Sequence, residues 1–171
     1  MSLRIALLRG INVGGHQMLA MADLRERAER LGLREPKTLL QSGNMVFHSD
    51  RKPTAIEKLL EDEFGVSSFV RTPEEWREII AGNPFLKEAK DDPGHLIVMA
   101  LKDSCDASVI KIPAPGRETA RGNGRHIYLY YPDGAGRSKL TNAFIERALG
   151  TRGTARNWNT VLKLASATES K

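Results

Sequence analysis

The sequence predicts an α+β fold made of two ferredoxin-like (split β-α-β) subdomains, the second irregular and ending in a helix. Two observations support this prediction. Residues 1–72 alternate short apolar runs with amphipathic helical patterns in the order β-α-β-β-α-β. Residues 95–171 repeat a similar order loosely. The segment between them, 73–94, is expected to hold a helix and a connection.

The elements of the first subdomain follow from the spacing of apolar residues and from glycines that stop the helices. Apolar residues recur at helical spacing from Met21 to Leu31, and Gly32 ends that helix. In chain order we expect a strand over 4–8, a helix over 21–31, strands over 37–41 and 44–48, a helix ending at Gly65 and a strand over 66–71.

Two helix starts carry the pattern of a capping box, in which a threonine and a glutamate three residues later satisfy free N–H groups. Thr54 with Glu57 predicts the start of the second helix. Thr72 with Glu75 predicts the start of a third helix, with Pro73 at its first position.

The second subdomain begins with an apolar run that predicts a strand over 95–101. Two further strands, over 118–121 and 126–131, are expected to form a hairpin around Gly122-Asn123-Gly124. Residues 104–112 fit either a short helix or a strand. Residues 83–94 are expected to be a connection, and helices are expected over 138–149 and 155–165.

The composition is that of a globular protein of 171 residues, 40% hydrophobic and 27% charged, with a net charge of +5. This charge favours anionic partners. No run approaches the roughly 18 apolar residues of a membrane span. The single cysteine, Cys105, excludes internal disulfides and a multi-cysteine zinc site. We therefore expect a cytoplasmic protein with no metal centre and no membrane partner.

A glycine-rich loop, RGINVGGH (residues 9–16), follows the first strand, and the turn QSGN (residues 41–44) follows the second. These strands run in parallel in the expected strand order 4-1-3-2, so both segments leave the same end of the sheet, about 10 Å apart. The loop lacks the spacing of dinucleotide-binding and Walker loops. It is either a plain turn that needs positive φ or a cradle for an anion. His16 is the group in it that titrates near neutral pH.

Two segments of the second subdomain have related features. GAGRSKLTN (residues 134–142) runs from a glycine-rich loop into a predicted helix, where free N–H groups, the helix dipole and two cations favour an anion. The alternative is a plain helix cap by Ser138. TARNWNT (residues 154–160) opens the last predicted helix, and there Trp158 is either a core residue or a stacking platform.

These four segments contain cations and amide and hydroxyl donors but no Asp or Glu. A pocket formed by them would suit phosphate or carboxylate and would lack the carboxylates that most metal sites and acid–base pairs use. Asp133, directly before Gly134, could join such a pocket. No catalytic residue is assigned. The residues predicted to bind the ligand are Arg9, Gly10, Asn12, Gly14, Gly15, Ser42, Gly43, Asn44, Arg137, Ser138, Lys139, Asn142, Arg156, Asn157 and Asn159.

The stretches RGINVGG, QSGNMVF, GRSKLTN and TARNWNTVLKL together resemble a family of bacterial proteins, domain of unknown function 1697, over essentially the whole chain. The resemblance implies an α+β protein of two small subdomains, with a helix near 103–112. It implies no chemistry. Its motif residues here are those predicted to bind the ligand, without Arg137 and with Thr141 and Trp158 added.

The function that this pattern favours is binding of a phosphate- or carboxylate-bearing small molecule, such as a nucleotide, in a cationic, glycine-rich cleft between the two halves. A second possibility is an enzyme acting on an anionic substrate, with Arg9, Lys139 and Arg156 as electrostatic stabilisers. The sequence specifies neither a cofactor nor an oligomeric state.

A third possibility is a nucleic-acid-binding module, because RNA-recognition domains share the split β-α-β fold. Tyr128 and Tyr130 are two residues apart and therefore share one face of a predicted strand, near Arg121 and Arg125. The alternative for this segment is an ordinary half-buried strand.

Overall fold

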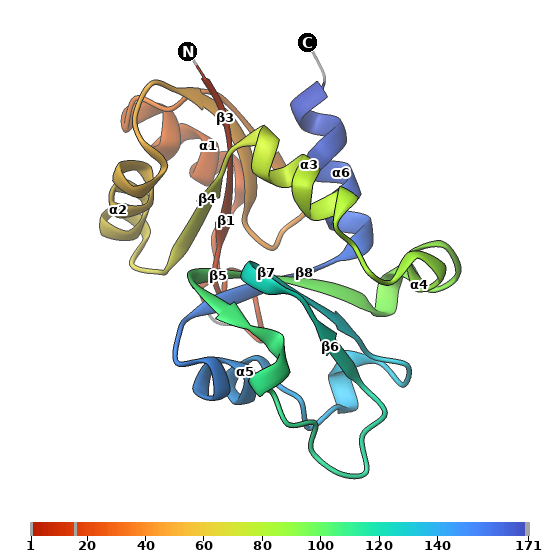
Figure 1. The fold of residues 1–171 in the computed structure, drawn as a ribbon. Helices are drawn as coiled ribbons and strands as arrows, with labels where there is room; N and C mark the ends of the chain where they lie inside the picture. Colours follow the sequence, from red (N-terminus) through yellow and green to blue (C-terminus); the bar gives the residue numbers. More distant parts are fainter. Residues whose placement is uncertain (1, 16, 170–171) are drawn as a thin grey trace. The chain divides into compact units, whose positions relative to one another are not determined.

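The computed structural model describes residues 2–15 and 17–169, which fall into two compact units (Figure 1). Unit 1 consists of Met1–Glu78 together with Lys163–Lys171, and unit 2 consists of Ile79–Leu162. Each unit contains one four-stranded sheet. The predicted α+β class is confirmed. The units differ from the predicted segments 1–72, 73–94 and 95–171 mainly because the end of the last helix groups with unit 1.

The elements of unit 1 occur in the predicted order. They are β1 (Ser2–Leu8), α1 (Met21–Arg30), β2 (Arg34–Leu39), β3 (Asn44–Ser49), α2 (Pro53–Phe64) and β4 (Ser68–Arg71), followed by α3 (Pro73–Ala81). The strand order β2-β3-β1-β4 is the predicted one. Because β1 and β2 both pair antiparallel with β3, they run in the same direction.

The core of unit 1 lies between one face of this sheet and helices α1 and α2. Alternate residues of β1, Ala6 and Leu8, point into it, as the two-residue period of a strand requires. Leu24 of α1 and Ile56 of α2 meet them there, both fully buried. The apolar spacing along the first part of the chain thus determines which helix faces cover the sheet.

The two predicted capping boxes differ in outcome. The box at α3 is confirmed: Thr72 Oγ1 accepts from the Glu75 N–H, and Glu75 Oε1 accepts from the Thr72 N–H, both at 3.1 Å. The box at α2 is wrong. Helix α2 already begins at Pro53, whose fixed φ suits the first helical position. Thr54 therefore lies inside the helix, and Glu57 instead accepts a 2.8 Å hydrogen bond from the N–H of Val70.

The predicted connection at 83–94 contains helical structure that the charges and prolines concealed. A short helix, α4 (Leu86–Asp91), and a 3-10 turn, η1 (Pro93–His95), occupy most of it. Each of these elements is six residues or shorter, too short to show an apolar period.

Unit 2 repeats the sheet topology of unit 1. Its elements are β5 (Leu96–Asp106), the 3-10 turn η2 (Ala107–Val109), β6 (Thr119–Arg121), β7 (Asn123–Tyr130), the 3-10 turn η3 (Ala135–Arg137), α5 (Asn142–Leu149), β8 (Gly153–Asn157) and α6 (Trp158–Glu169). The order β6-β7-β5-β8 matches β2-β3-β1-β4 strand for strand. The irregular feature is η2, which stands where unit 1 has α1. The ambiguous segment 104–112 is thus the end of a strand followed by one 3-10 turn.

The predicted helix at 155–165 is wrong at its start. Residues 153–157 form strand β8, which pairs antiparallel with β5, with Ala155 opposite Met99. Gly153 is needed in this strand, because a Cβ there would lie 2.7 Å from Met99 Cε and 2.9 Å from the Ala100 carbonyl oxygen. The helix begins at Trp158, so the strand that the sequence prediction missed completes the second sheet.

The predicted helix at 138–149 also begins later than expected. Helix α5 starts at Asn142, and its cap is Thr141, whose Oγ1 accepts from the Phe144 N–H at 3.1 Å. Ser138 is therefore not the N-cap of α5 and lies instead at the C-terminal end of η3. The hairpin of β6 and β7 is confirmed, with Arg121 opposite Tyr128. In the expected turn, however, residues 123–124 continue β7 and pair with the end of β5.

In the described part of the chain, none of the helices combines the length and the apolar character that a membrane crossing needs.

Candidate functional site

The two loops of unit 1 lie side by side, as the strand order predicted. The N–H of Leu8, at the end of β1, donates a 2.8 Å hydrogen bond to the carbonyl of Gly43. The Asn12 amide donates a 2.7 Å hydrogen bond to the carbonyl of Gln41. The predicted separation of about 10 Å is therefore wrong, because the turn after β2 contacts the loop after β1 directly.

The polar side chains of these loops hold the loops themselves. Asn12 also donates to the Leu19 carbonyl and accepts from the Leu19 N–H, at 2.9 and 2.7 Å. The fully buried Asn44 donates to the carbonyl of Leu39 and to Ser42 Oγ. The backbone N–H of Arg9 donates to the Ser67 carbonyl at 2.9 Å. These bonds give the loop asparagines a structural role.

The glycines of the same loops have backbone conformations that favour glycine. Gly10, Gly14 and Gly15 all have positive φ, between 58° and 78°. Gly43 has a φ of 85° and leaves no room for a side chain, because a Cβ there would lie 3.0 Å from Leu8 Cβ. These observations fit the plain-turn interpretation, and ligand binding by these loop residues stays a prediction. His16 lies outside the described residues.

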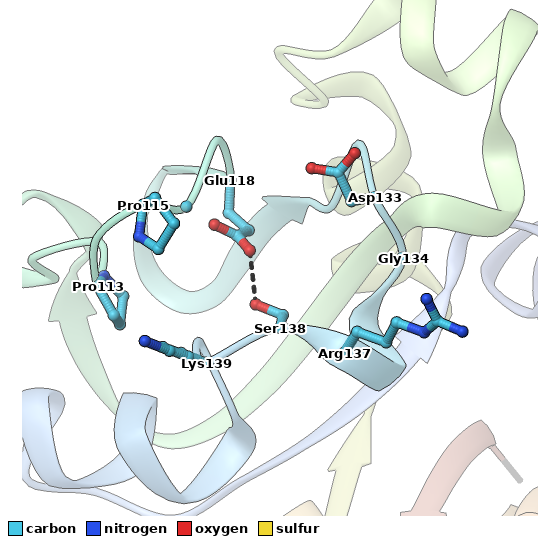
Figure 2. Close-up of a pocket in the computed structure, with 9 residues that line it drawn as sticks. Pro113, Pro115, Glu118, Asp133, Gly134, Arg137, Ser138 and Lys139 are labelled. Atoms are coloured by element: carbon cyan, nitrogen blue, oxygen red, sulfur yellow. Dashed lines mark hydrogen bonds between the residues drawn. The ribbon is translucent and has the colours of Figure 1, made fainter.

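A pocket of about 180 Å³ lies in unit 2 and includes three of the predicted binding residues. Figure 2 shows it between the loop before β6 and the segment that joins β7 to α5. It is lined by Pro113, Pro115, Gly116, Glu118, Asp133, Gly134, Arg137, Ser138 and Lys139. The predicted segment 134–142 is thus one wall of a pocket, although the helix start at Asn142 is not part of that lining.

The centre of this pocket is a hydrogen-bonded pair. Ser138 Oγ donates to Glu118 Oε1 at 2.7 Å and accepts from the Leu140 N–H at 2.9 Å. The second carboxylate oxygen, Glu118 Oε2, is buried and accepts no hydrogen bond from the described residues. In Figure 2 the Lys139 ammonium is directed toward Pro113, whereas the Arg137 guanidinium points away from both Glu118 and Lys139.

The expectation of a site without carboxylates is wrong for this pocket, because Glu118 and Asp133 both line it. The two carboxylates differ in their partners. Asp133 forms a two-point ion pair with Arg117, and the hydrogen bonds from that guanidinium lower the pKa of Asp133. Glu118 accepts a hydrogen bond from the Ser138 hydroxyl and forms no salt bridge with a described residue, although its charge contributes to raising the pKa of Arg117. Charge in the pocket is therefore mixed rather than purely cationic.

Glu118 and the loop before it are not among the predicted site residues, although one feature of the sequence indicates them. The hairpin register sets Thr119 opposite Tyr130, so Glu118 precedes β6 at the sheet end where residues 131–134 leave β7. A predicted hairpin therefore already brings Glu118 next to the segment that begins with Asp133. The turn of Pro113 and Gly116, closed by a 2.9 Å hydrogen bond from the Gly116 N–H to the Pro113 carbonyl, has no apolar period to reveal it.

The remaining predicted residues of unit 2 do not line this pocket. Arg156 lies on β8, where burial lowers its pKa to about 10 and its guanidinium donates to Thr154 Oγ1 at 2.7 Å. Asn157 caps α6, because its Oδ1 accepts from the Thr160 N–H at 3.0 Å.

Asn142 and Asn159 are exposed in the first turns of their helices. Trp158, only 5% exposed, is a core residue rather than a stacking platform.

The tyrosines of β7 are engaged within unit 2. Tyr128 is 7% exposed, and its hydroxyl donates to the Ile79 carbonyl. The hydroxyl of Tyr130 donates to Asp92 at 2.7 Å, and its ring packs against Phe85. The buried ring of Tyr128 offers no face on which a base could stack. This geometry favours the interpretation of an ordinary half-buried strand over a nucleic-acid platform.

Comparisons with known proteins agree with the fold and assign no chemical activity. The chain resembles the solved structure of a conserved bacterial protein, SP0830 from Streptococcus pneumoniae, with a TM-score of 0.74 and 21% sequence identity. The match covers 96% of this chain and 97% of the other. Among curated proteins, none matches this sequence. The model of a family described as a protein of unknown function, DUF1697, matches residues 1–128. Since this match covers most of the chain, the protein belongs to the DUF1697 family.

Proposed function

We propose that this protein binds a small molecule through a carboxylate or phosphate group, and that Lys139 in the pocket of unit 2 recognises that group. The observation that carries the proposal is that the ammonium of Lys139 has no partner in the described ranges. Its ammonium lines the pocket, and it forms neither a hydrogen bond nor an ion pair with any residue in the described ranges. A lysine is a compact charge with three donors, which suits a carboxylate or phosphate oxygen.

The charges around the pocket support an anionic ligand. The negative charge of Asp133 is offset by Arg117. Among the lining residues, this leaves the carboxylate of Glu118 against the cations Arg137 and Lys139. The lining residues therefore carry one more positive than negative charge, and since the Arg137 guanidinium is directed away from Glu118 and Lys139, Lys139 is the cation that meets a bound anion.

The size and walls of the pocket limit the class of ligand. About 180 Å³ is below the roughly 300–1,000 Å³ of sites that enclose drug-sized molecules. Pro113 and Pro115 supply apolar surface, while Lys139 and Glu118 supply the few polar groups that fix orientation. These properties favour a small metabolite, or the charged end of a larger molecule, over a polymer.

The test is isothermal titration calorimetry with acetate, propionate, inorganic phosphate and adenosine monophosphate, on wild type and on Lys139→Met. We expect at least one of these anions to bind the wild type. The variant should bind it about 10- to 100-fold more weakly, as the loss of a charge-assisted hydrogen bond implies.

The matched control is Lys87→Met, which removes an exposed lysine of the same unit that lies outside the pocket lining. Equal affinity in Lys139→Met and Lys87→Met, or no binding of any anion to the wild type at millimolar concentration, would contradict the proposed function.

A further inference from the structure

We infer that the ligand of this pocket is a small zwitterion, which places its ammonium group at Glu118 and its carboxylate or phosphate group at Lys139. This inference rests on the proposed function and adds a second recognised group to it. It depends on three properties of Glu118: one carboxylate oxygen accepts no hydrogen bond, Ser138 orients the carboxylate, and Glu118 forms no ion pair with Lys139.

The first property is the unsatisfied oxygen. Glu118 Oε1 accepts from Ser138, but Oε2 is buried without a hydrogen bond from the described residues. A buried acceptor without a donor is costly, and buried polar groups are nearly always paired. A donor supplied by the ligand would remove this cost, once a small shift of the Glu118 side chain opens Oε2, which has almost no accessible surface without a ligand, to the pocket. An ammonium group would also complement the negative charge of the carboxylate.

The second property is that Ser138 orients the Glu118 carboxylate. Ser138 Oγ accepts from the Leu140 N–H, so its own proton is directed to Glu118. The same arrangement means that the Ser138 hydroxyl is not available to donate to a ligand anion. The backbone of Gly116 also lies close to this carboxylate, because a Cβ on Gly116 would overlap Glu118 Oε2. The hydrogen bond from Ser138 therefore orients the Glu118 carboxylate in the pocket.

The third property is the relation between the two charges. Glu118 and Lys139 line the same pocket but form no ion pair with each other. Figure 2 shows Arg137 directed away from both, which leaves Lys139 to meet the anionic group of a ligand. An anion that carries no hydrogen-bond donor would bind Lys139, but Glu118 would stay without a partner and would repel that anion. A zwitterion satisfies both side chains, so the pocket selects it over a simple anion.

The inference is tested by titration calorimetry on the full chain with an amino-acid series and its truncated analogues. The series is glycine, β-alanine and γ-aminobutyrate, together with the phosphate-bearing phosphoethanolamine. The analogues are propionate, which lacks the ammonium group, and ethylamine, which lacks the anionic group. We expect one member of the series to bind about tenfold or more tightly than either analogue. The preferred member then reports the spacing of the two charges and the identity of the anionic group.

A matched pair of variants assigns the ammonium group to Glu118. Glu118→Gln keeps the acceptor for Ser138 and removes the charge. The affinity of the preferred zwitterion should fall to within about threefold of that for propionate. Propionate itself should bind equally or more tightly, because a like charge has been removed. Asp91→Asn, an exposed carboxylate of the same unit outside the pocket lining, should leave both affinities unchanged.

The outcomes separate this inference from the proposed function. Propionate and the zwitterions binding with equal affinity, in a manner that depends on Lys139, would overturn the zwitterion and leave the anion site standing. No binding that depends on Lys139, with any compound of the series, would overturn both. The wild-type comparison of zwitterions with propionate needs no variant, so the inference stays testable even if Glu118→Gln fails to fold.

Discussion

Gly116 lies so close to Glu118 that a Cβ atom on the glycine would overlap Glu118 Oε2. The same Cβ would lie 2.7 Å from the carbonyl oxygen of Pro113, to which the Gly116 N–H donates. A carboxylate at the end of a side chain can move away from a new methyl group, but the backbone carbonyl of a closed turn cannot do so easily. This position therefore tolerates a side chain only if the turn and the pocket change together.

The first prediction is that Gly116→Ala destabilises the protein by about 1–3 kcal/mol, the usual cost of inserting a methyl group where none fits. Chemical denaturation measures this change. The control is Gly136→Ala, where a Cβ meets no atom within 4 Å and φ is not positive. That substitution should be neutral or slightly stabilising, because alanine reduces the freedom of the unfolded chain. Equal stability of the two variants would show that the turn relaxes at no cost.

The second prediction concerns the glycine-rich loop of unit 1. Asn12→Ala removes three hydrogen bonds, two donated by the amide and one accepted from the Leu19 N–H. It also puts alanine at a φ of 57°, a conformation that asparagine tolerates better. At roughly 1 kcal/mol for each bond, partly compensated by water, we expect a loss of about 2–4 kcal/mol in the free energy of unfolding.

Urea denaturation of Asn12→Ala measures that loss, and Val13→Ala serves as the control in the same loop. Val13 is 61% exposed, so its truncation should change the free energy of unfolding by less than about 0.5 kcal/mol. A similarly small effect for Asn12→Ala would mean that the loop is not held by this side chain.

The third prediction separates two threonines that have the same sequence pattern. Thr72→Ala removes the cap of α3 and should cost about 1 kcal/mol. Thr54→Ala should be neutral or slightly stabilising, because Thr54 lies inside α2, where alanine is the better helix former. Thermal unfolding of both variants measures the contrast. If Thr54→Ala costs as much as Thr72→Ala, the start of α2 at Pro53 is wrong.

These threonines illustrate how much of the first unit the sequence could predict. Apolar spacing and glycine stops located the six predicted elements and their sheet order, because local pattern and tertiary packing agree there. The capping-box pattern failed at Thr54 because Pro53 fits the first helical position, so the N-cap is Lys52, two residues before Thr54. A short motif thus predicts a cap only if no neighbouring residue competes for the start.

Strand β8 was missed for a different reason. Residues 153–157 (GTARN) contain neither an apolar alternation nor β-branched residues apart from Thr154. What makes them a strand is pairing with β5, more than 50 residues earlier in the chain. Long-range pairing of this kind overrides local propensity, and a single sequence does not display it. The same applies to the boundary of α5, where Thr141 rather than Ser138 provides the cap.

The candidate site was predicted in part. Arg137, Ser138 and Lys139 were expected to bind a ligand, and all three line the pocket of unit 2. Glu118 was not expected, because the predicted site was assembled from cation-rich segments, although the predicted pairing of β6 with β7 already brings Glu118 to this sheet end. A search for segments rich in cations finds one wall of a mixed-charge pocket and overlooks the carboxylate on the other wall.

The fourth prediction concerns stability at alkaline pH. Burial raises the pKa of Tyr131 to about 12, and its hydroxyl donates a 2.9 Å hydrogen bond to the Leu140 carbonyl. In the unfolded chain the same phenol ionises near its ordinary pKa of about 10. Between these values the folded state holds a proton that the unfolded state has lost. The stabilisation from the neutral phenol is therefore fully present below pH 10 and decreases above it, by up to about 1.4 kcal/mol for each pH unit.

Tyr131→Phe isolates this effect. The variant should lose about 1 kcal/mol at pH 8, because the Leu140 carbonyl loses its donor. Between pH 10 and 11 its free energy of unfolding should fall less steeply than that of the wild type, so the two curves converge. Urea denaturation at half-unit steps from pH 8 to 11 measures both curves, and every other titrating group contributes equally to the two proteins. Parallel curves over the whole range would mean that the phenol of Tyr131 ionises as easily in the folded protein as in the unfolded chain.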